Sequence, residues 1–129
     1  MKVKLPKTVS QLRDKADRIF SLRRRAEESD ENGFCFCVTC GVRRHWKEMD
    51  LGHFIGRGYM AVRYEKSNSW PQCRRCNRFR QGDHSRYRDN LIKIVGVTEV
   101  ERLEKEKYKP IVFLRSFLEE ILESFKRGA

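Results

Sequence analysis

Apolar side chains recur every three or four positions near the start of the chain, and this spacing predicts an amphipathic helix from about Val9 to Glu28. Thr8 and Gln11 stand at the spacing of a capping box, in which side chains satisfy free backbone amides of the first helical turn. The run 23–25 of three arginines is interpreted as a solvated face, with a clamp on DNA as the alternative. The apolar positions are Val9, Leu12, Ala16, Ile19 and Phe20, with Leu22 or Arg23 as a continuation.

A second apolar stripe lies near the end of the chain, where Pro110 predicts the first turn of a last helix. We interpret this stripe as core or as a contact between helices, and a homodimer seam is the functional alternative. Upstream, Thr98 and Glu101 form another capping-box pair, which predicts a short helix to about Lys107. The stripe consists of Ile111, Leu114, Phe117, Leu118, Ile121, Leu122 and Phe125.

Short β-prone segments occupy the middle of the chain. Phe34–Val38 is aromatic and β-prone, which predicts a strand. The segments Trp46–Met49 and Leu51–Ile55 predict the two arms of an irregular hairpin that presents His53. Short strands between helical ends predict an α+β fold.

A further helical stretch is expected in the second half of the chain. Asn77 to about Gly82 predicts the start of a helix, and Arg86–Val95 predicts another helical segment. Gly82 and Asp83 are the predicted interruption between the two, because glycine followed by aspartate favours a turn.

Two pairs of cysteines carry the clearest chemical signal. Each pair has C-x2-C spacing, and a tight turn of this kind brings two sulfurs onto one ion, so that two turns supply the tetrahedral set that zinc prefers. Between the pairs lie 32 residues, Gly41–Gln72, more than the roughly 15–20 of a plain four-cysteine finger. The intervening segment should therefore do more than close the metal loop. Cys35 is left over and is interpreted as a small buried side chain. The predicted ligands are Cys37, Cys40, Cys73 and Cys76.

Basic residues outnumber acidic ones, 29 to 18, which gives a formal net charge of +11. The excess is concentrated in residues 43–88, which hold 12 basic and 4 acidic side chains, whereas residues 89–129 hold 8 of each. A polyanion is the natural partner of such a patch, because Lys and Arg that neutralise phosphates release condensed counterions. A basic surface that only keeps the protein dissolved is the alternative.

The length of 129 residues fits one domain. We divide it into a basic N-terminal helix at 1–33, a zinc-bearing core at 34–95 and C-terminal helices at 96–129. Thiolates on a metal, no apolar leader and no apolar run of membrane length indicate a reducing, intracellular setting without a membrane partner.

The residues between and after the cysteine pairs resemble the active site of a known superfamily. His53 precedes the second pair, Asn68 stands shortly before it, and Asn77 follows its last cysteine directly. This arrangement resembles the His-Me finger (HNH) nucleases of the zinc-bearing type and is similar to phage resolvase-like endonucleases. The resemblance implies a zinc-stabilised ββα-metal core with N- and C-terminal helices.

A longer pattern resembles the phage lambda NinG (Rap) family of recombination endonucleases. It reads D-x-G-H-F, then R-Y-E-x-x-N-x-x-x-Q-C-x-x-C-N, then a glycine, a tyrosine and L-I-x-x-x-G-x-x-x-x-E-R-L. So many positions in order are far more specific than the two cysteine pairs alone. The matching residues are Asp50, Gly52, His53, Phe54, Arg63, Tyr64, Glu65, Asn68, Gln72 to Asn77, Gly82, Tyr87, Leu91, Ile92, Gly96 and Glu101 to Leu103.

The superfamily resemblance implies a role for each site residue. His53 would be the general base that takes a proton from the attacking water, a task that suits an imidazole near its ordinary pKa of about 6.5. Asn77 would hold one Mg²⁺ or Mn²⁺, which stabilises charge on the leaving 3′ oxygen. Asn68 would brace the loop opposite His53. Zinc would fix these pieces and take no part in the reaction.

One position departs from the superfamily pattern. Many members carry an Asp directly before the catalytic His as a second metal ligand, whereas this chain has Gly52 there. Asp50 could replace it only if the strand bends, since residues three apart on an ideal strand face opposite sides. His84 is the competitor, because it lies two helical turns after Asn77 if that helix is unbroken. Both alternatives stay open.

Arginines near the site predict contacts to DNA. Arg57, four residues beyond His53, is predicted to clamp a phosphate, because a guanidinium can bond two oxygens at once. His45 is interpreted as a surface residue, and Trp70 and Tyr87 as packing residues rather than base-stacking ones. The other predicted phosphate contacts are Arg63, Arg74, Arg75, Arg78 and Arg80.

These features together predict a metal-dependent DNA endonuclease. A preference for branched recombination intermediates, such as Holliday junctions and D-loops, is implied by the NinG resemblance alone. So is a phage protein that acts in the cytoplasm of a bacterial host. The alternative is a zinc-stabilised DNA-binding module without catalysis, and an RNA-directed nuclease is a third hypothesis.

Overall fold

The N-terminal helix forms as its capping residues predict. A computed structural model describes residues 4–81 and 83–128, and in it α1 spans Val9–Glu27. Thr8 is the N-cap, and the two hydrogen bonds that join it to Gln11 measure 2.8 and 3.1 Å. These bonds satisfy amides that the first turn would otherwise leave unpaired. The capping-box prediction is therefore confirmed.

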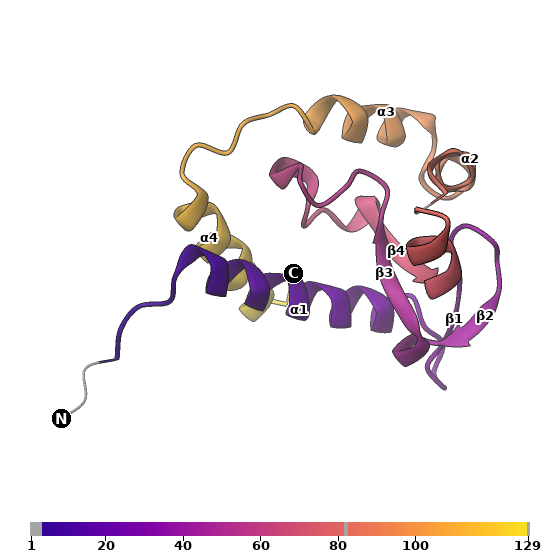
Figure 1. The fold of residues 1–129 in the computed structure, drawn as a ribbon, viewed down its shortest axis with the longest axis horizontal. Coiled ribbons are helices and arrows are strands. Elements are labelled where there is room, and N and C mark those ends of the chain that lie inside the picture. Colours follow the sequence, from indigo (N-terminus) through magenta and orange to yellow (C-terminus); the bar gives the residue numbers. More distant parts are fainter. Residues whose placement is uncertain (1–3, 82, 129) are drawn as a thin grey trace.

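Two small antiparallel hairpins form the β part of the fold. β1 (Phe34–Phe36) pairs with β2 (Arg43–His45), and β3 (Met49–His53) pairs with β4 (Ser69–Cys73). The β3–β4 hairpin lies in the middle of the molecule, with α1 on one side of it in Figure 1. The mixed α+β class with small antiparallel sheets is as predicted.

The pairing predicted around His53 is wrong. Trp46–Glu48 forms a 3-10 helix instead of a strand arm. β3 pairs with β4, from which the loop of residues 54–68 separates it in the sequence. In the register of β3 and β4, Met49 lies opposite Cys73, and His53 lies opposite Ser69. The hairpin therefore carries the histidine at one end and a cysteine at the other.

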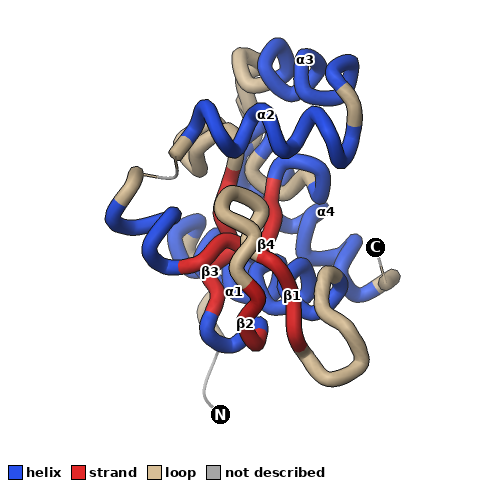
Figure 2. Tube along the Cα trace, turned by 90° about the vertical axis from the view of Figure 1, so that its right-hand side faces the viewer, coloured by secondary structure: helices blue, strands red, loops and turns tan. Residues whose placement is uncertain are grey.

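Four helical segments follow the hairpins. A short π-helix, Arg75–Phe79, succeeds β4 directly, and then come α2 (His84–Val95), α3 (Val97–Glu106) and α4 (Leu114–Lys126). In Figures 1 and 2, α2 and α3 lie on the side of the β3–β4 hairpin away from α1. None of the helices in the described part of the chain is long and apolar enough to cross a membrane.

Two predicted helix starts are wrong. Gly96, at a φ of 89°, is the N-cap of α3, so Thr98 lies inside the helix and makes no capping bond. A glycine there lets the chain turn from α2 into α3 within one residue. α4 begins at Leu114 and not near Pro110, and residues 107–113 form a connection along the edge of the molecule (Figure 1).

Helix α4 packs against α1, which confirms that its apolar stripe is a helix contact. Leu118 and Phe125 are buried in one cluster with Leu12 and Phe20 of α1. The ring centroids of Phe20 and Phe125 are 6.2 Å apart in a stacked arrangement. A homodimer through this helix stays a prediction.

The arginine run of α1 does not form a solvated face. Arg24 is only 4% exposed, and its Nε and Nη2 donate to the backbone oxygen of Ser69 at 3.1 and 2.8 Å. Its guanidinium also lies over the Trp70 ring, 4.8 Å from the centroid. Arg25 donates to the backbone oxygen of Met49 at 3.1 Å. These two arginines tie α1 to both strands of the hairpin, so neither is placed as a clamp on DNA.

Candidate functional site

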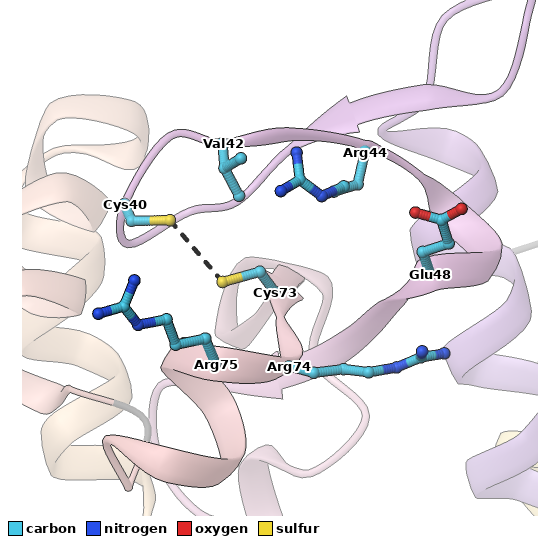
Figure 3. A pocket seen from close by; sticks show the side chains of 7 residues that line it. All are labelled: Cys40, Val42, Arg44, Glu48, Cys73, Arg74 and Arg75. Carbon is cyan, nitrogen blue, oxygen red and sulfur yellow. Dashed lines mark hydrogen bonds between the residues drawn. The ribbon is translucent and has the colours of Figure 1, made fainter.

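The four predicted zinc ligands come together at the cysteine end of the hairpins. Their sulfur atoms all lie within 4.8 Å of one another, and those of Cys40 and Cys73 are 3.7 Å apart (Figure 3). The edge of a tetrahedron of zinc–sulfur bonds is about 3.8 Å, so this cluster could hold a structural zinc ion. Backbone amides of Thr39 and Cys40 each lie 3.4 Å from Cys37 Sγ, as in a zinc knuckle.

A hollow of about 420 Å³ lies at the histidine end, between β3, the loop after it and the π-helix. It brings together five of the predicted site residues. Although Asp50 and His53 are three residues apart on β3, both line this hollow. The residues that line it are Asp50, Leu51, His53, Gly56, Arg57, Asn77 and Arg78.

The imidazole of His53 is held in one orientation. Its Nε2 lies 3.0 Å from the backbone oxygen of Arg63, and its ring centroid is 6.4 Å from that of Phe20 in α1. A carbonyl oxygen can only accept a hydrogen bond, so Nε2 carries the proton of the neutral ring. Nδ1 is then the nitrogen with a free lone pair, as a general base requires.

Burial keeps this imidazole neutral. Desolvation lowers the pKa of His53 to about 4, although the hydrogen bond to the Arg63 carbonyl opposes the shift. This pKa lies well below the ordinary imidazole value of about 6.5 that the sequence led us to expect. The residue is therefore fully unprotonated at pH 7, and Arg57 and Arg63 nearby also disfavour a positive ring.

The carboxylate of Asp50 and the side-chain amide of Asn77 form a hydrogen-bonded pair in the same hollow as this histidine. Asn77 Nδ2 donates to Asp50 Oδ2 at 3.0 Å, and Arg78 donates to both carboxylate oxygens at 2.9 Å. Burial alone would raise the pKa of Asp50, but the bonds from Arg78 and Asn77 hold it below its ordinary value. The carboxylate is therefore ionised at neutral pH.

Asn68 fixes the loop that follows His53. It is fully buried; its Oδ1 accepts from the amide of Ile55 at 2.8 Å, and its Nδ2 donates to the backbone oxygens of Ile55 and Val62 at 3.0 and 3.1 Å. Three bonds from one side chain hold both ends of the loop. They fit the bracing role that the resemblance implies, and a part of Asn68 in catalysis stays a prediction.

The structure leaves no room for a side chain at Gly52, the position where many members of the superfamily that the chain resembles carry an aspartate. A Cβ at this position would lie 2.1 Å from Gln72 Oε1 and 2.8 Å from Gln72 Cβ. Gln72 itself is fully buried, so it has little room to move away.

Tyr87 contacts the backbone of Gly52. Its hydroxyl donates to the backbone oxygen of Gly52 at 2.7 Å, which supports the interpretation of Tyr87 as a packing residue.

Comparison with protein families identifies the chain. The family model described as bacteriophage lambda NinG protein matches residues 1–127. The chain belongs to this NinG family. No curated protein and no solved structure gave a match. The family match covers nearly the whole chain, so the segments that form α1 and α4 lie within it as well.

Five of the six arginines predicted to contact DNA in this NinG-family chain are exposed. Arg63 differs from the prediction, because its side chain is only 12% exposed and forms an ion pair with Asp17 at 2.5 Å. Its guanidinium is therefore engaged within the protein and is not placed to contact a phosphate. Figure 3 shows Arg74 and Arg75 beside Cys73, around a further hollow over the cysteine cluster. The exposed five are Arg57, Arg74, Arg75, Arg78 and Arg80.

His84 does not line the hollow of the NinG site. The helix from Arg75 ends at Phe79, and Gln81 and Asp83 both have a left-handed backbone, so His84 is not two turns along an unbroken helix. Its ring stacks on Phe54 instead, with centroids 4.7 Å apart. The break itself was predicted, and Gly82, to which it was partly assigned, lies outside the described residues.

The two remaining residues of uncertain role have structural tasks. Cys35 is buried apart from the zinc set, as interpreted, and its thiol lies 3.7 Å from the backbone oxygen of Arg44. His45, interpreted as a surface residue, is half-buried and caps the 3-10 helix, where its Nδ1 accepts from the amide of Lys47 at 3.2 Å.

Sequence reasoning missed the contributions of α1 to the NinG site. Asp17 bonds Arg63, and Arg24 bonds the strand residue opposite His53. One signal was available: Arg24 continues the four-residue spacing of Leu12, Ala16 and Phe20. A charge on the buried stripe of a helix requires a specific partner. For Asp17 we find no comparable signal.

The depressed pKa of His53 predicts a pH dependence of stability in the NinG-family chain. The folded state holds the pKa at about 4, whereas the unfolded value is about 6.5, so protons bind preferentially to the unfolded chain. The contribution is present above pH 6.5 and is lost as pH falls toward 4, with a total of roughly 3 kcal/mol. Unfolding by urea between pH 4 and 7 measures it.

The matched comparison is His53→Asn, which does not titrate. Its shorter side chain also loses the donor to the Arg63 carbonyl, an effect that is the same at every pH. Acid weakens other groups too, so the quantity of interest is the difference in unfolding free energy between the two proteins at each pH. Wild type should lose stability relative to His53→Asn below pH 6.5. Parallel curves for the two proteins would contradict the depressed pKa.

Proposed function

We propose that this NinG-family chain is a metal-dependent DNA endonuclease of the His-Me finger type. The observation that carries the proposal is the hollow in which an imidazole with a free Nδ1, an ionised carboxylate and a side-chain amide meet between exposed arginines. Phosphodiester hydrolysis needs a base, a centre of positive charge and contacts to phosphate. Branched recombination intermediates are the proposed substrates, and that preference rests on the family resemblance alone.

His53 supplies the base in this proposal. Because Nε2 is bound to the Arg63 carbonyl, Nδ1 can take a proton from a water in the hollow. The burial that lowers the pKa of His53 also ensures that the unprotonated form is present well below pH 7. The ring cannot turn freely, since Phe20 lies beside it and the carbonyl holds its other nitrogen.

Asp50 and Asn77 fit a small, hard divalent cation. Their side chains are within 3.0 Å of each other and offer carboxylate and amide oxygens, the ligands that Mg²⁺ and Mn²⁺ prefer. Rotation of the Asn77 amide by half a turn would present its oxygen in place of its nitrogen. Asp50 and Asn77 would hold such a cation, which would supply Lewis-acid stabilisation of negative charge in the hollow. Mg²⁺ is commonly bound through one or two protein ligands with waters and substrate oxygens, so two residues suffice.

Arg78 links the cation site to the substrate. Its guanidinium now neutralises Asp50 through two bonds of 2.9 Å. With a cation at Asp50 this guanidinium would have to give up part of the carboxylate, which frees its donors for a phosphate. Arg57 lies across the hollow and is exposed, so the two arginines could hold one strand on either side.

The surrounding fold supports a ββα-metal core. β3, β4 and the helical turn Arg75–Phe79 follow the ββα order, and they carry His53, Cys73 and Asn77 respectively. The cysteine cluster, filled by structural zinc, would hold the helical turn against the hairpin. Zinc then has no contact with the hollow that performs the reaction.

One observation favours the alternative of a DNA-binding module without catalysis. Asp50 already has strong partners in Arg78 and Asn77, so its charge is balanced within the protein. A basic zinc-stabilised module would need nothing more. A cleavage assay on branched and linear DNA with Mg²⁺ or Mn²⁺ separates the two functions.

Asp50→Asn is the variant that tests the cation site. Loss of the carboxylate should lower cleavage by about 100-fold or more, since a bound metal contributes several kcal/mol to such reactions. DNA affinity should stay equal or rise, because a negative charge is removed beside Arg78 and Arg74. Glu48→Gln, an exposed carboxylate two residues earlier, is the matched control and should cut as wild type does.

Three outcomes decide against parts of the proposal. A wild-type protein that binds DNA and never cuts it supports the non-catalytic module. Full cleavage by Asp50→Asn removes Asp50 as a metal ligand. Faster cleavage of structured RNA than of DNA favours the RNA-directed hypothesis.

A further inference from the structure

Asp17, on the N-terminal helix, holds a cluster of side chains directly behind His53. Its two carboxylate oxygens accept from Arg63 Nε at 2.9 Å and Arg63 Nη2 at 2.5 Å, and Oδ1 also accepts from the Tyr64 hydroxyl at 2.8 Å. The carboxylate is 22% exposed, and Arg57 Nη1 lies 3.9 Å away. A two-bond contact between arginine and carboxylate fixes the plane of both groups.

This carboxylate is charged in the folded protein. Burial alone would raise the pKa of Asp17, but hydrogen bonds from Arg63 and Tyr64 hold it below its ordinary value. Burial and the hydrogen bond to Asp17 raise the pKa of Tyr64, so its hydroxyl remains a donor. The cluster is therefore a fixed set of donors around one anion at neutral pH.

Arg63 connects Asp17 to the imidazole. Its side chain bonds Asp17, its Nη1 donates to the backbone oxygen of Arg57 at 2.7 Å, and its own backbone oxygen lies 3.0 Å from His53 Nε2. Both the side chain and the main chain of Arg63 are thus held. The direction of its carbonyl, which selects the protonated nitrogen of His53, depends on these contacts.

We propose that Asp17 is a positioning residue for His53. By fixing Arg63 it keeps the Arg63 carbonyl within hydrogen-bond distance of Nε2, and this leaves Nδ1 as the unprotonated nitrogen of a ring that lines the hollow. The N-terminal helix is then a working part of the site, although Asp17 lies far from His53 in the sequence. The consequence for catalysis rests on the proposed function, whereas the effect on the imidazole can be measured without it.

A purely structural role for the cluster makes a different prediction. If Asp17 only attached α1 to the loop, its loss would lower stability without changing the protonation of His53. A positioning role requires the distribution of the proton between Nδ1 and Nε2 to change. Imidazole nitrogen NMR of the folded, zinc-loaded protein reports that distribution at pH 7.

The variants are Asp17→Ala and Asp17→Asn, with Asp14→Asn as the matched control. Asp14 is exposed on the same helix, and its substitution also removes one negative charge. Wild type and Asp14→Asn should show His53 protonated at Nε2 alone. Asp17→Ala should show a mixture of the two neutral forms, and Asp17→Asn, which keeps the shape of the side chain, a smaller admixture.

Cleavage gives the second readout. Asp17→Ala should lower kcat about 10-fold to 100-fold, the usual effect of removing a partner that orients a catalytic or metal-bound histidine, with little change in KM. Asp17→Glu, which restores a carboxylate, should recover much of the loss. Thermal unfolding identifies any variant that does not fold, and Asp17→Asn is the variant on which the comparison then depends.

The result that would overturn the proposal is a His53 proton distribution in the folded Asp17 variants equal to that of Asp14→Asn. A wild-type ring protonated at Nδ1 would overturn it too. Failure of the proposed function looks different: wild type would cut no DNA, while the NMR comparison would still decide whether Asp17 positions the ring.

Discussion

Removal of zinc is expected to unfold the part of the NinG-family chain that carries His53 and Asn77. The small cluster around the sulfurs buries Cys35, Cys37, Met49 and Cys76, and the partly buried Val42, Trp46 and Cys73 pack against it. Zinc binding supplies on the order of 10 kcal/mol to small zinc domains, whereas whole proteins are stable by only about 5–15 kcal/mol. The metal is therefore expected to provide most of the stability of the end of the β3–β4 hairpin that carries Cys73.

Cys76→Ser is the substitution that tests this expectation, and Cys35→Ala is its matched control. Both cysteines are about 1% exposed, but only Cys76 belongs to the four-sulfur cluster. Cys76→Ser should bind zinc poorly and melt at a much lower temperature, whereas Cys35→Ala should keep one zinc per chain. Metal analysis and thermal unfolding by circular dichroism measure both effects. Equal melting of wild type with and without a zinc chelator would contradict a structural role.

The zinc effect should also depend on pH. Burial raises the pKa of the Cys76 thiol, so its coordination by zinc releases a proton. Affinity for zinc should therefore weaken as pH falls. Competition with a chromophoric chelator at several pH values provides the measurement.

His53→Ala is expected to abolish most DNA cleavage and leave DNA binding intact. A positioned general base contributes about 10²–10⁴-fold to the rate, so kcat should fall by this factor. The ring is neutral at pH 7, since its pKa lies at about 4, and it adds no charge to the attraction of DNA. Affinity at constant salt should therefore match wild type.

The matched control is His84→Ala. His84 is exposed and stacks on Phe54 outside the hollow, so its loss should change cleavage little. Cleavage kinetics and binding isotherms on the same branched substrate give both quantities. A large loss of cleavage in His84→Ala, with His53→Ala near wild type, would assign the general base to His84 and contradict the role proposed for His53.

The elements that the sequence predicted correctly are those set by local spacing. The capping residues Thr8 and Gln11 and the apolar positions after them define α1 without help from the rest of the chain. The zinc ligands follow from two C-x2-C turns, each of which prepares its own pair of sulfurs. In both cases the deciding residues lie within a few positions of one another.

The errors concern contacts between distant segments. β3 pairs with β4 across the loop that holds Asn68, and no local pattern shows that a strand will skip its nearest neighbour. Thr98 fits a capping box, but the turn at Gly96 starts α3 first. The contact between Asp17 and Arg63 joins residues 46 positions apart, so only the folded chain reveals it.

The sequence named residues of the candidate site but not the groups that hold them in place. His53, Asn77 and Asp50 were named from the sequence, and the structure places them in one hollow. The carbonyl that orients the imidazole belongs to Arg63, which was expected to bind DNA. A backbone oxygen leaves no trace in a residue pattern, and this is why its role was missed.

The tight fit of Gly52 against Gln72 means that positions 52 and 72 act as one unit for protein engineering. An aspartate introduced directly before the histidine, as in many His-Me finger nucleases, would clash with the glutamine on the neighbouring strand. Alanine at position 72 would still carry the Cβ that lies 2.8 Å away, so glycine would have to be introduced there with it. The close approach of the two strands at positions 52 and 72 thus excludes an acidic side chain at position 52. The spacing of the strands and the residue at position 52 cannot be changed independently.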